Sequence, residues 1–164
     1  MRAFAFAFLL SMSACAAPQP YAIQAPFNPA QVAWIQSTGT GTIKGQAFLK
    51  TVGGDVKTCA GNIVVLMPSS AYTREIVSAG MSSNNRSSSL ANLNGDLGSY
   101  MKAGRCDAQG NFSIVSLPAG NYILLTEVTW GVPRGNYGVS REGGPLTQEI
   151  SLAMGEDKQV ILSR

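Results

Sequence analysis

The stretch NFSIVSLPAGNYILLTEVTW (111–130) decides the fold of this chain. Its two ends, NFSIV (111–115) and NYILLTEVTW (121–130), carry the alternation and the β-branched and aromatic residues typical of strands. LPAG (117–120) between them combines Pro and Gly, as turns do. Alternate side chains of the second segment share one face: Tyr122, Leu124, Thr126, Val128 and Trp130. We therefore predict two successive strands joined by a turn.

Other short strands are predicted on both sides of this pair. They are TIKGQAFLK (42–50), the apolar run NIVVLM (62–67), a segment around Ile150 to Met154, and 158–162 after a Gly-Glu-Asp turn. Six or seven short strands at this spacing are typical of a sandwich. The expected fold is therefore all-β: a single antiparallel β-sandwich of about seven strands, spanning residues 39–164.

Two segments lack this strand pattern. Residues 73–98 are rich in Ser and Asn, with SSNNRSSS (82–89) at their centre, and we predict a long surface loop there. Residues 15–38 contain several prolines and are expected to form an extended, semi-stiff linker. Within this linker Asn28 and Pro29 have the residue types of a helix N-cap and first position, although the same run could also pair as a strand.

The N-terminus MRAFAFAFLLSMSAC (1–15) has the features of an export signal. Arg2 supplies a positive charge before the apolar run 3–10. As a helix this run rises only about 12 Å, whereas the hydrocarbon core of a bilayer is about 30 Å thick, so it cannot span a membrane. A charged start, a short apolar run and small residues before a cleavage point are marks of a removable secretory signal.

The residues Met-Ser-Ala-Cys (12–15) resemble the lipobox of bacterial lipoproteins, with Met12 standing where that family usually has Leu. The resemblance implies that the signal 1–14 is removed and that Cys15 carries acyl chains such as palmitate. Ala16, not Asp, follows the cysteine, which implies an outer-membrane position facing the periplasm. The alternatives are an ordinary secretory signal with a chance cysteine, or an N-terminal core strand.

The remaining cysteines, Cys59 and Cys106, form an even pair once Cys15 carries lipid. In an oxidising compartment such a pair favours a disulfide, and two buried free thiols are the alternative. Closing a loop of about 48 residues would stabilise the fold by about 4 kcal/mol in the chain-entropy model. Two cysteines without any histidine lack the usual zinc ligand set, so we expect no metal site.

The low net charge and the absence of histidine argue against two classes of function, nucleic-acid binding and histidine-dependent catalysis. Twelve basic and nine acidic residues give a net charge of +3 without a basic cluster, so we expect no nucleic-acid binding. The chain contains no histidine, which excludes Ser-His-Asp and Cys-His catalysis. The acidic residues are scattered, and Glu127 is the one candidate for an inward position, although an outward one is favoured. We expect no enzymatic activity and no cofactor.

The pattern from Asp107 to Tyr122, D-x-x-G-x-F followed by L-P-A-G-x-Y, resembles the signature of carboxypeptidase regulatory-like domains. That family has a transthyretin-like β-sandwich, and the resemblance covers roughly residues 39–164. It implies an accessory module and carries over no catalytic residue. In physical terms, Asp107 and Gly110 make a turn into a strand, and Phe112 anchors that strand in the core.

Two functions follow as hypotheses. The first is a lipid-anchored structural or protein-interaction module that joins an envelope protein complex. The second is a glycan- or peptide-binding module, with Trp130 and Tyr137 as candidate ligand-binding residues and Trp34 as a further aromatic. Against the second, Trp130 is expected to end a core face and Trp34 to cover the sandwich edge.

Overall fold

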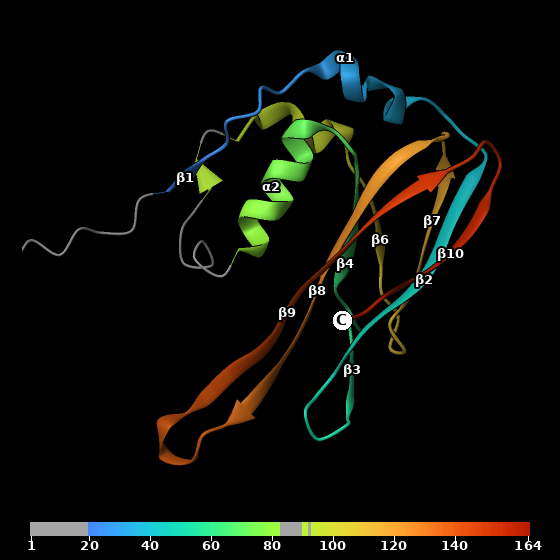
Figure 1. Cartoon of the computed structure of the whole chain (residues 1–164). Coiled ribbons are helices and arrows are strands. Elements are labelled where there is room, and N and C mark those ends of the chain that lie inside the picture. The colour runs from blue at the N-terminus through green and yellow to red at the C-terminus, as the bar shows by residue number, and fades with distance from the viewer. Residues whose placement is uncertain (1–19, 83–89, 92) are drawn as a thin grey trace, which may run out of the picture.

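The computed structural model describes residues 20–82, 90–91 and 93–164, which form a two-sheet β-sandwich (Figure 1). One sheet contains β10 (Asp157–Leu162), β2 (Gly41–Lys50), β3 (Val56–Thr58) and β7 (Asn111–Leu117). The other contains β6 (Lys102–Arg105), β4 (Ile63–Pro68), β8 (Gly120–Pro133) and β9 (Val139–Leu152) in that order. The predicted all-β sandwich is confirmed.

Strand pairing within these two sheets is antiparallel except for β2 and β10, which run parallel. The turn after β9 contains Gly155 with a positive φ of 69°, and it passes the chain from one sheet to the other. Both strands then start at the same end of the sandwich, where the N–H of Thr42 donates to the carbonyl of Glu156 at 2.9 Å. The expected antiparallel sandwich therefore has one mixed sheet.

The core lies between the two sheets and is filled by alternate residues of each strand. Tyr122, Leu124 and Val128 of β8 are fully buried, and Ile43 and Ala47 of β2 face them from the other sheet. This is the face predicted from the period-2 pattern, because successive side chains of a strand point to opposite sides of a sheet.

The predicted disulfide joins Cys59 to Cys106, with a Cα–Cα distance of 5.8 Å. Both cysteines are buried in the main core. The bond links the residue after β3 to the residue after β6, so it joins the ends of two strands that belong to different sheets.

The segment predicted as a long surface loop, 73–98, is largely ordered, and that prediction is wrong for its first part. Residues Ala71–Met81 form helix α2, which begins at the N-cap Ser70, and Gly95–Tyr100 form the 3₁₀ helix η3. Tyr72, Ile76 and Ala79 recur at helical spacing and pack in a second, smaller apolar cluster. This apolar stripe is what the Ser- and Asn-rich composition concealed. Of the SSNNRSSS run, all but Ser82 lies outside the described residues.

Residues 20–36, expected to be a linker, pack against the sandwich instead; we call them the N-terminal strap. β1 (Tyr21–Ala22) pairs in parallel with β5 (Leu90–Ala91). Helix α1 (Pro29–Val32) and the 3₁₀ helix η1 (Ala33–Gln36) follow, and Asn28 caps α1 as predicted by accepting from the N–H of Ala30 at 3.0 Å. The linker prediction failed because Val32 and Ile35 bury their side chains fully.

Strands β8 and β9 continue past the sandwich as a hairpin arm (residues 129–143) that projects from one end of the molecule (Figure 1). Pairing between β4 and β8 stops at Leu125, so β4 does not support the arm. The short 3₁₀ helix η4 (Gly135–Tyr137) forms its tip. The structure shows no helix, within the ranges it describes, with the length and apolar character needed to cross a bilayer.

Candidate functional site

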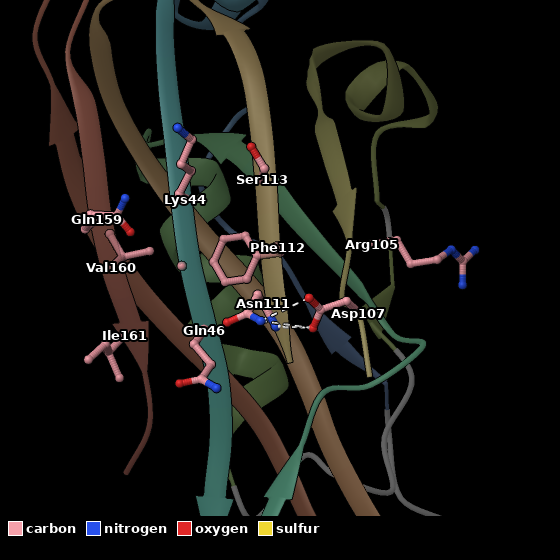
Figure 2. A pocket seen from close by; sticks show the side chains of 11 residues that line it. Lys44, Gln46, Arg105, Asp107, Asn111, Phe112, Ser113, Gln159, Val160 and Ile161 are labelled. Atoms are coloured by element: carbon pink, nitrogen blue, oxygen red, sulfur yellow. Dashed lines mark hydrogen bonds between the residues drawn. The ribbon is translucent and has the colours of Figure 1, made fainter. Parts of the chain in front are cut away.

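A groove of about 630 Å³ lies on the outer face of β10, β2 and β7 (Figure 2). Strand register builds its surface, because residues paired across neighbouring strands present their side chains on the same face. One row across the three strands consists of Gln159, Lys44 and Ser113, and the next consists of Ile161, Gln46 and Asn111. Neighbouring strands lie about 4.8 Å apart and successive rows about 6.6 Å apart, so these side chains form a regular grid.

The turn before β7 borders the groove and fixes the position of Asn111. The carboxylate of Asp107 accepts from the N–H of Gln109 at 2.9 Å and from the N–H of Asn111 at 2.8 Å. The side-chain amide of Asn111 also donates to it, at 3.0 Å. These hydrogen bonds, those from Asn111 first, lower the pKa of Asp107. The carboxylate therefore orders the turn, with its oxygens already engaged.

The floor of the groove is rigid because β2 is packed closely against its neighbours. A Cβ placed on Gly45 would lie 2.6 Å from the ring of Phe112 and 2.6 Å from Val160, so only glycine fits there. Phe112 and Val160 are themselves buried in the core beneath the sheet. The outward side chains of the groove thus stand on a fixed backbone.

The groove offers hydrogen-bonding groups beside the exposed apolar side chain of Ile161. Gln46 already donates to the carbonyl of Gln109 at 2.9 Å, which orients its amide. Lys44 lies 4.0 Å from Asp157, and both side chains are at least half exposed, so their ion pair is weak. Amides, a hydroxyl and an ammonium donate and accept at fixed spacing, which suits a ligand rich in hydroxyl groups.

Trp130 and Tyr137 do not meet in this structure, and neither lines the groove. Tyr137 is 96% exposed at the tip of the hairpin arm. Trp130 is half-buried and packs against the main core. Their role as ligand-binding residues stays a prediction. The third aromatic, Trp34, is half-buried and contacts the ring of Tyr122 edge-on, with centroids 4.9 Å apart.

The other residues singled out from the sequence are placed as follows. Cys15 lies outside the described residues. Glu127 points outward and pairs with Arg141 at 2.9 Å. Gly110 has a positive φ of 82°, as the predicted turn requires. The hydroxyl of Tyr122 donates to the carbonyl of Pro118 at 2.5 Å, and burial raises the pKa of Tyr122 to about 12.

Sequence reasoning missed the groove because its residues come from three distant segments. Lys44 and Gln46 precede Asn111 and Ser113 by more than sixty positions, and Gln159 follows near the C-terminus. Each strand carries only a short polar alternation, which is typical of any solvated sheet face. Only the parallel pairing of β10 with β2 brings the third strand beside the other two.

Comparison with solved structures supports the fold. A proposed carbohydrate-binding protein from Pseudomonas aeruginosa superimposes with a TM-score of 0.74 at 21% sequence identity, covering 85% of this chain and 99% of that chain. A minor pilin from Streptococcus agalactiae reaches a TM-score of only 0.38 at 13% identity, covering 77% of this chain and 44% of the pilin. This score is too low to indicate a shared fold. No protein-family model and no curated protein matches the chain. The likeness to the first structure establishes a β-sandwich fold shared with a bacterial protein.

Proposed function

We propose that this chain is a non-catalytic carbohydrate-binding module of the bacterial cell envelope. The observation that carries the proposal is the groove on β10, β2 and β7, a rigid grid of amide, hydroxyl and ammonium groups. The solved structure that shares the fold is itself described as a proposed carbohydrate-binding protein, which supports the same ligand class. The amide, hydroxyl and ammonium groups of the groove complement the hydroxyl groups of a sugar, and Ile161 offers apolar contact beside them.

The groove also indicates how strongly it would bind. No aromatic ring stands on its outer surface, since Phe112 is buried beneath the sheet. Hydrogen bonds exchanged with water contribute only about 0.5–1.5 kcal/mol each. We therefore expect a dissociation constant on the order of 0.1–1 mM for a short oligosaccharide, equivalent to about 4–5.5 kcal/mol.

Catalysis is not part of the proposal. Histidine is absent from the whole sequence, and the carboxylate of Asp107 at the border of the groove is already engaged by three donor groups of its own turn. A general acid or base needs a free carboxyl or imidazole within reach of the substrate.

A glycan array probed with the mature chain tests the function, and isothermal titration with a retained oligosaccharide tests the site. Gln46→Ala and Gln159→Ala should each weaken binding by about three- to tenfold, since one or two hydrogen bonds are lost. Gln31→Ala, the same change at an exposed position of α1, is the matched control. If Trp130→Ala or Tyr137→Ala abolishes binding instead, the groove is the wrong site. A chain that binds no glycan on the array would refute the function.

We further propose that the sandwich is a carboxypeptidase regulatory-like domain, held at the outer membrane by lipid on Cys15 and facing the periplasm. Support for the domain comes from its motif, in which Asp107 and Gly110 make the turn, Phe112 enters the core and Tyr122 follows the second turn. Support for the anchor comes from the sequence around Cys15. Cys15→Ser should leave an unprocessed precursor that takes up no labelled palmitate, and continued labelling would refute the anchor.

The hairpin arm favours a second candidate function, contact with an envelope protein. Its tip exposes Tyr137 almost completely and Val139 by 71%, although nothing in the fold requires apolar side chains there. A photo-crosslinking residue at position 137 would capture a protein partner from intact envelopes if the arm is a docking element. Crosslinks at 137 without any glycan binding would favour this function over the first.

A further inference from the structure

The carboxylate of Glu75 on helix α2 accepts hydrogen bonds from the N-terminal strap. Glu75 accepts through Oε1 from the hydroxyl of Tyr21 at 3.1 Å and from the N–H of Gln24 at 2.8 Å. Through Oε2 it accepts from the N–H of Ala25 at 2.7 Å. These hydrogen bonds, with that from Gln24 first, lower the pKa of Glu75, so the carboxylate stays charged where it holds the strap.

Apolar contacts hold the strap along the rest of its length. Ile23 is 4% exposed in the smaller apolar cluster. The ring of Phe27 contacts Tyr72 of α2 at a centroid distance of 5.2 Å and Tyr100 of η3 at 5.7 Å. Further along, Ile35 is fully buried in the main core. The strap is therefore part of the folded body from its first described residues onward.

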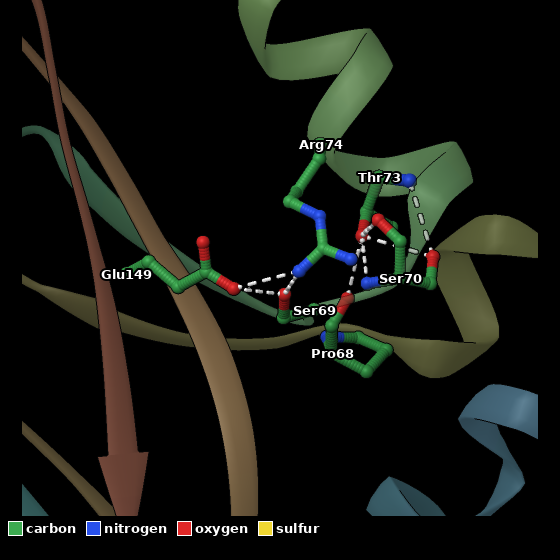
Figure 3. A network of polar contacts seen from close by, with 6 residues as sticks. All are labelled: Pro68, Ser69, Ser70, Thr73, Arg74 and Glu149. Carbon is green, nitrogen blue, oxygen red and sulfur yellow. Dashed lines mark hydrogen bonds and ion pairs between the residues drawn. The ribbon is translucent and has the colours of Figure 1, made fainter.

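Helix α2 is in turn fastened to the sandwich (Figure 3). Arg74 Nη1 donates to Glu149 Oε1 of β9 at 3.0 Å, and Ser69 donates to the same carboxylate oxygen. Thr73 Oγ1 donates to the carbonyl of Pro68, the last residue of β4, at 2.7 Å. Strap, helix and sheet thus form one connected unit.

The distance between the lipid-bearing residue and this unit is short. Cys15 precedes Pro20, the first described residue, by five positions. A fully extended chain covers at most about 3.3–3.6 Å per residue, so this segment reaches no further than about 18 Å. A free linker from residue 15 to residue 38 would have reached about 80 Å. A folded domain of this size has a radius of gyration of about 15 Å, so the available reach is less than its width.

We infer that the end of the molecule formed by the strap and α2 lies against the bilayer that carries the acyl chains of Cys15. The inference rests on the proposed lipid anchor. In Figure 1, β1 and α2 lie at one end, and the tip of the hairpin arm and the turn between β2 and β3 lie at the other. The groove strands β2, β7 and β10 lie on the side away from β1. The strap thus presents the groove and the arm to the aqueous phase.

Energy transfer from single labels to the membrane tests this orientation in the lipidated full chain. The chain is reconstituted in vesicles of phosphatidylethanolamine and phosphatidylglycerol that contain an acceptor lipid. A donor dye is attached at Gly80→Cys on α2, where a Cβ meets nothing within 4 Å, or at Val52→Cys in the fully exposed β2–β3 turn. The native Cys59 and Cys106 are bonded to each other, so each variant has one free thiol.

Transfer efficiency at position 80 should exceed that at position 52 at least twofold. Inserting twenty Gly and Ser residues between Ala17 and Pro18 frees the body from the bilayer and should reduce the ratio to near one. Equal transfer at both positions without the insertion, in chains shown to carry palmitate, would overturn the orientation and leave the anchor intact. Chains that carry no palmitate would overturn the anchor and this inference together.

Discussion

Gly120, the last residue of the LPAG turn, should be intolerant of any side chain because of one neighbour, Trp34. A Cβ built on Gly120 would lie 2.3 Å from both Cη2 and Cζ3 of the Trp34 ring. The ring is not free to move aside, since its Nε1 donates to the carbonyl of Gln31 at 3.0 Å and the ring contacts that of Tyr122 edge-on. Gly120→Ala should therefore lower the free energy of unfolding by about 1–3 kcal/mol, the usual cost of overpacking.

The sign of this effect should reverse when the ring is absent. All three atoms nearest to the new Cβ belong to Trp34. In a Trp34→Ala background, Gly120→Ala should therefore stabilise the chain by about 0.4–1 kcal/mol, because alanine restricts the unfolded chain more than glycine does. The two values give a coupling energy of about 1.5–4 kcal/mol between positions 34 and 120.

A double-mutant cycle measures this coupling. The four chains are unfolded in urea, with the transition followed by far-UV circular dichroism, since Trp34→Ala itself alters the fluorescence. Trp34→Ala alone should destabilise the chain by less than the 3–5 kcal/mol typical of a fully buried tryptophan, because Trp34 is only half-buried. If Gly120→Ala has the same cost in both backgrounds, the contact with Trp34 does not explain the glycine.

Three further predictions concern the disulfide, a buried hydroxyl and the strap. Replacing both Cys59 and Cys106 with Ala should lower the free energy of unfolding by about 4 kcal/mol, since the bond closes a loop with a sequence separation of 47; a loss below about 1 kcal/mol in urea titrations would contradict this. Because burial raises the pKa of Tyr122 from 10.0 to about 12, its contribution to stability should be complete below pH 10 and lost as pH rises towards 12; Tyr122→Phe should remove the step at highest pH from the tyrosine titration followed by absorbance at 295 nm, and a titration left unchanged would disprove the assignment. Because hydrogen bonds lower the pKa of Glu75 from 4.5, its contribution should be present above pH 4.5 and lost as pH falls below that value; Glu75→Gln should speed amide exchange at Ala25 at neutral pH, and unchanged exchange would argue against the carboxylate as the fastener of the strap.

The sandwich could be predicted from the sequence because strands and turns are specified by patterns within short segments. Alternation identified β8 and only the last residues of β9, and Pro118 with Gly120 identified a turn. Helix α2 was missed because serine and asparagine dominate residues 73–98 as a whole, although Ser70 with Thr73 offered a capping pattern and Tyr72 the first residue of an apolar stripe. The strap was missed because the spacing of prolines indicates only how stiff an isolated chain is. Burial of the strap depends on contacts with α2 and with the sandwich, which lie far away in the sequence.

The candidate site could not be predicted in the same way. Its grid depends on which strands are neighbours and in what register, and register is set by long-range packing. The aromatic residues Trp130 and Tyr137 indicate a ligand site by their ring chemistry alone, and the structure places Trp130 against the core and Tyr137 at a hairpin tip. Residue type indicates the chemistry of one side chain, whereas strand order and register decide which side chains lie next to one another.

The parallel pairing of β2 with β10 bears on when this protein can fold during its synthesis. Six register pairs join Thr42–Ala47 to Asp157–Leu162, so β2 cannot complete its pairing until a strand that lies far along the chain has emerged. Contacts that are so distant in sequence form late, because the intervening chain must first be closed into a loop. The sheet that contains β2 is therefore completed only after every strand of the other sheet has emerged.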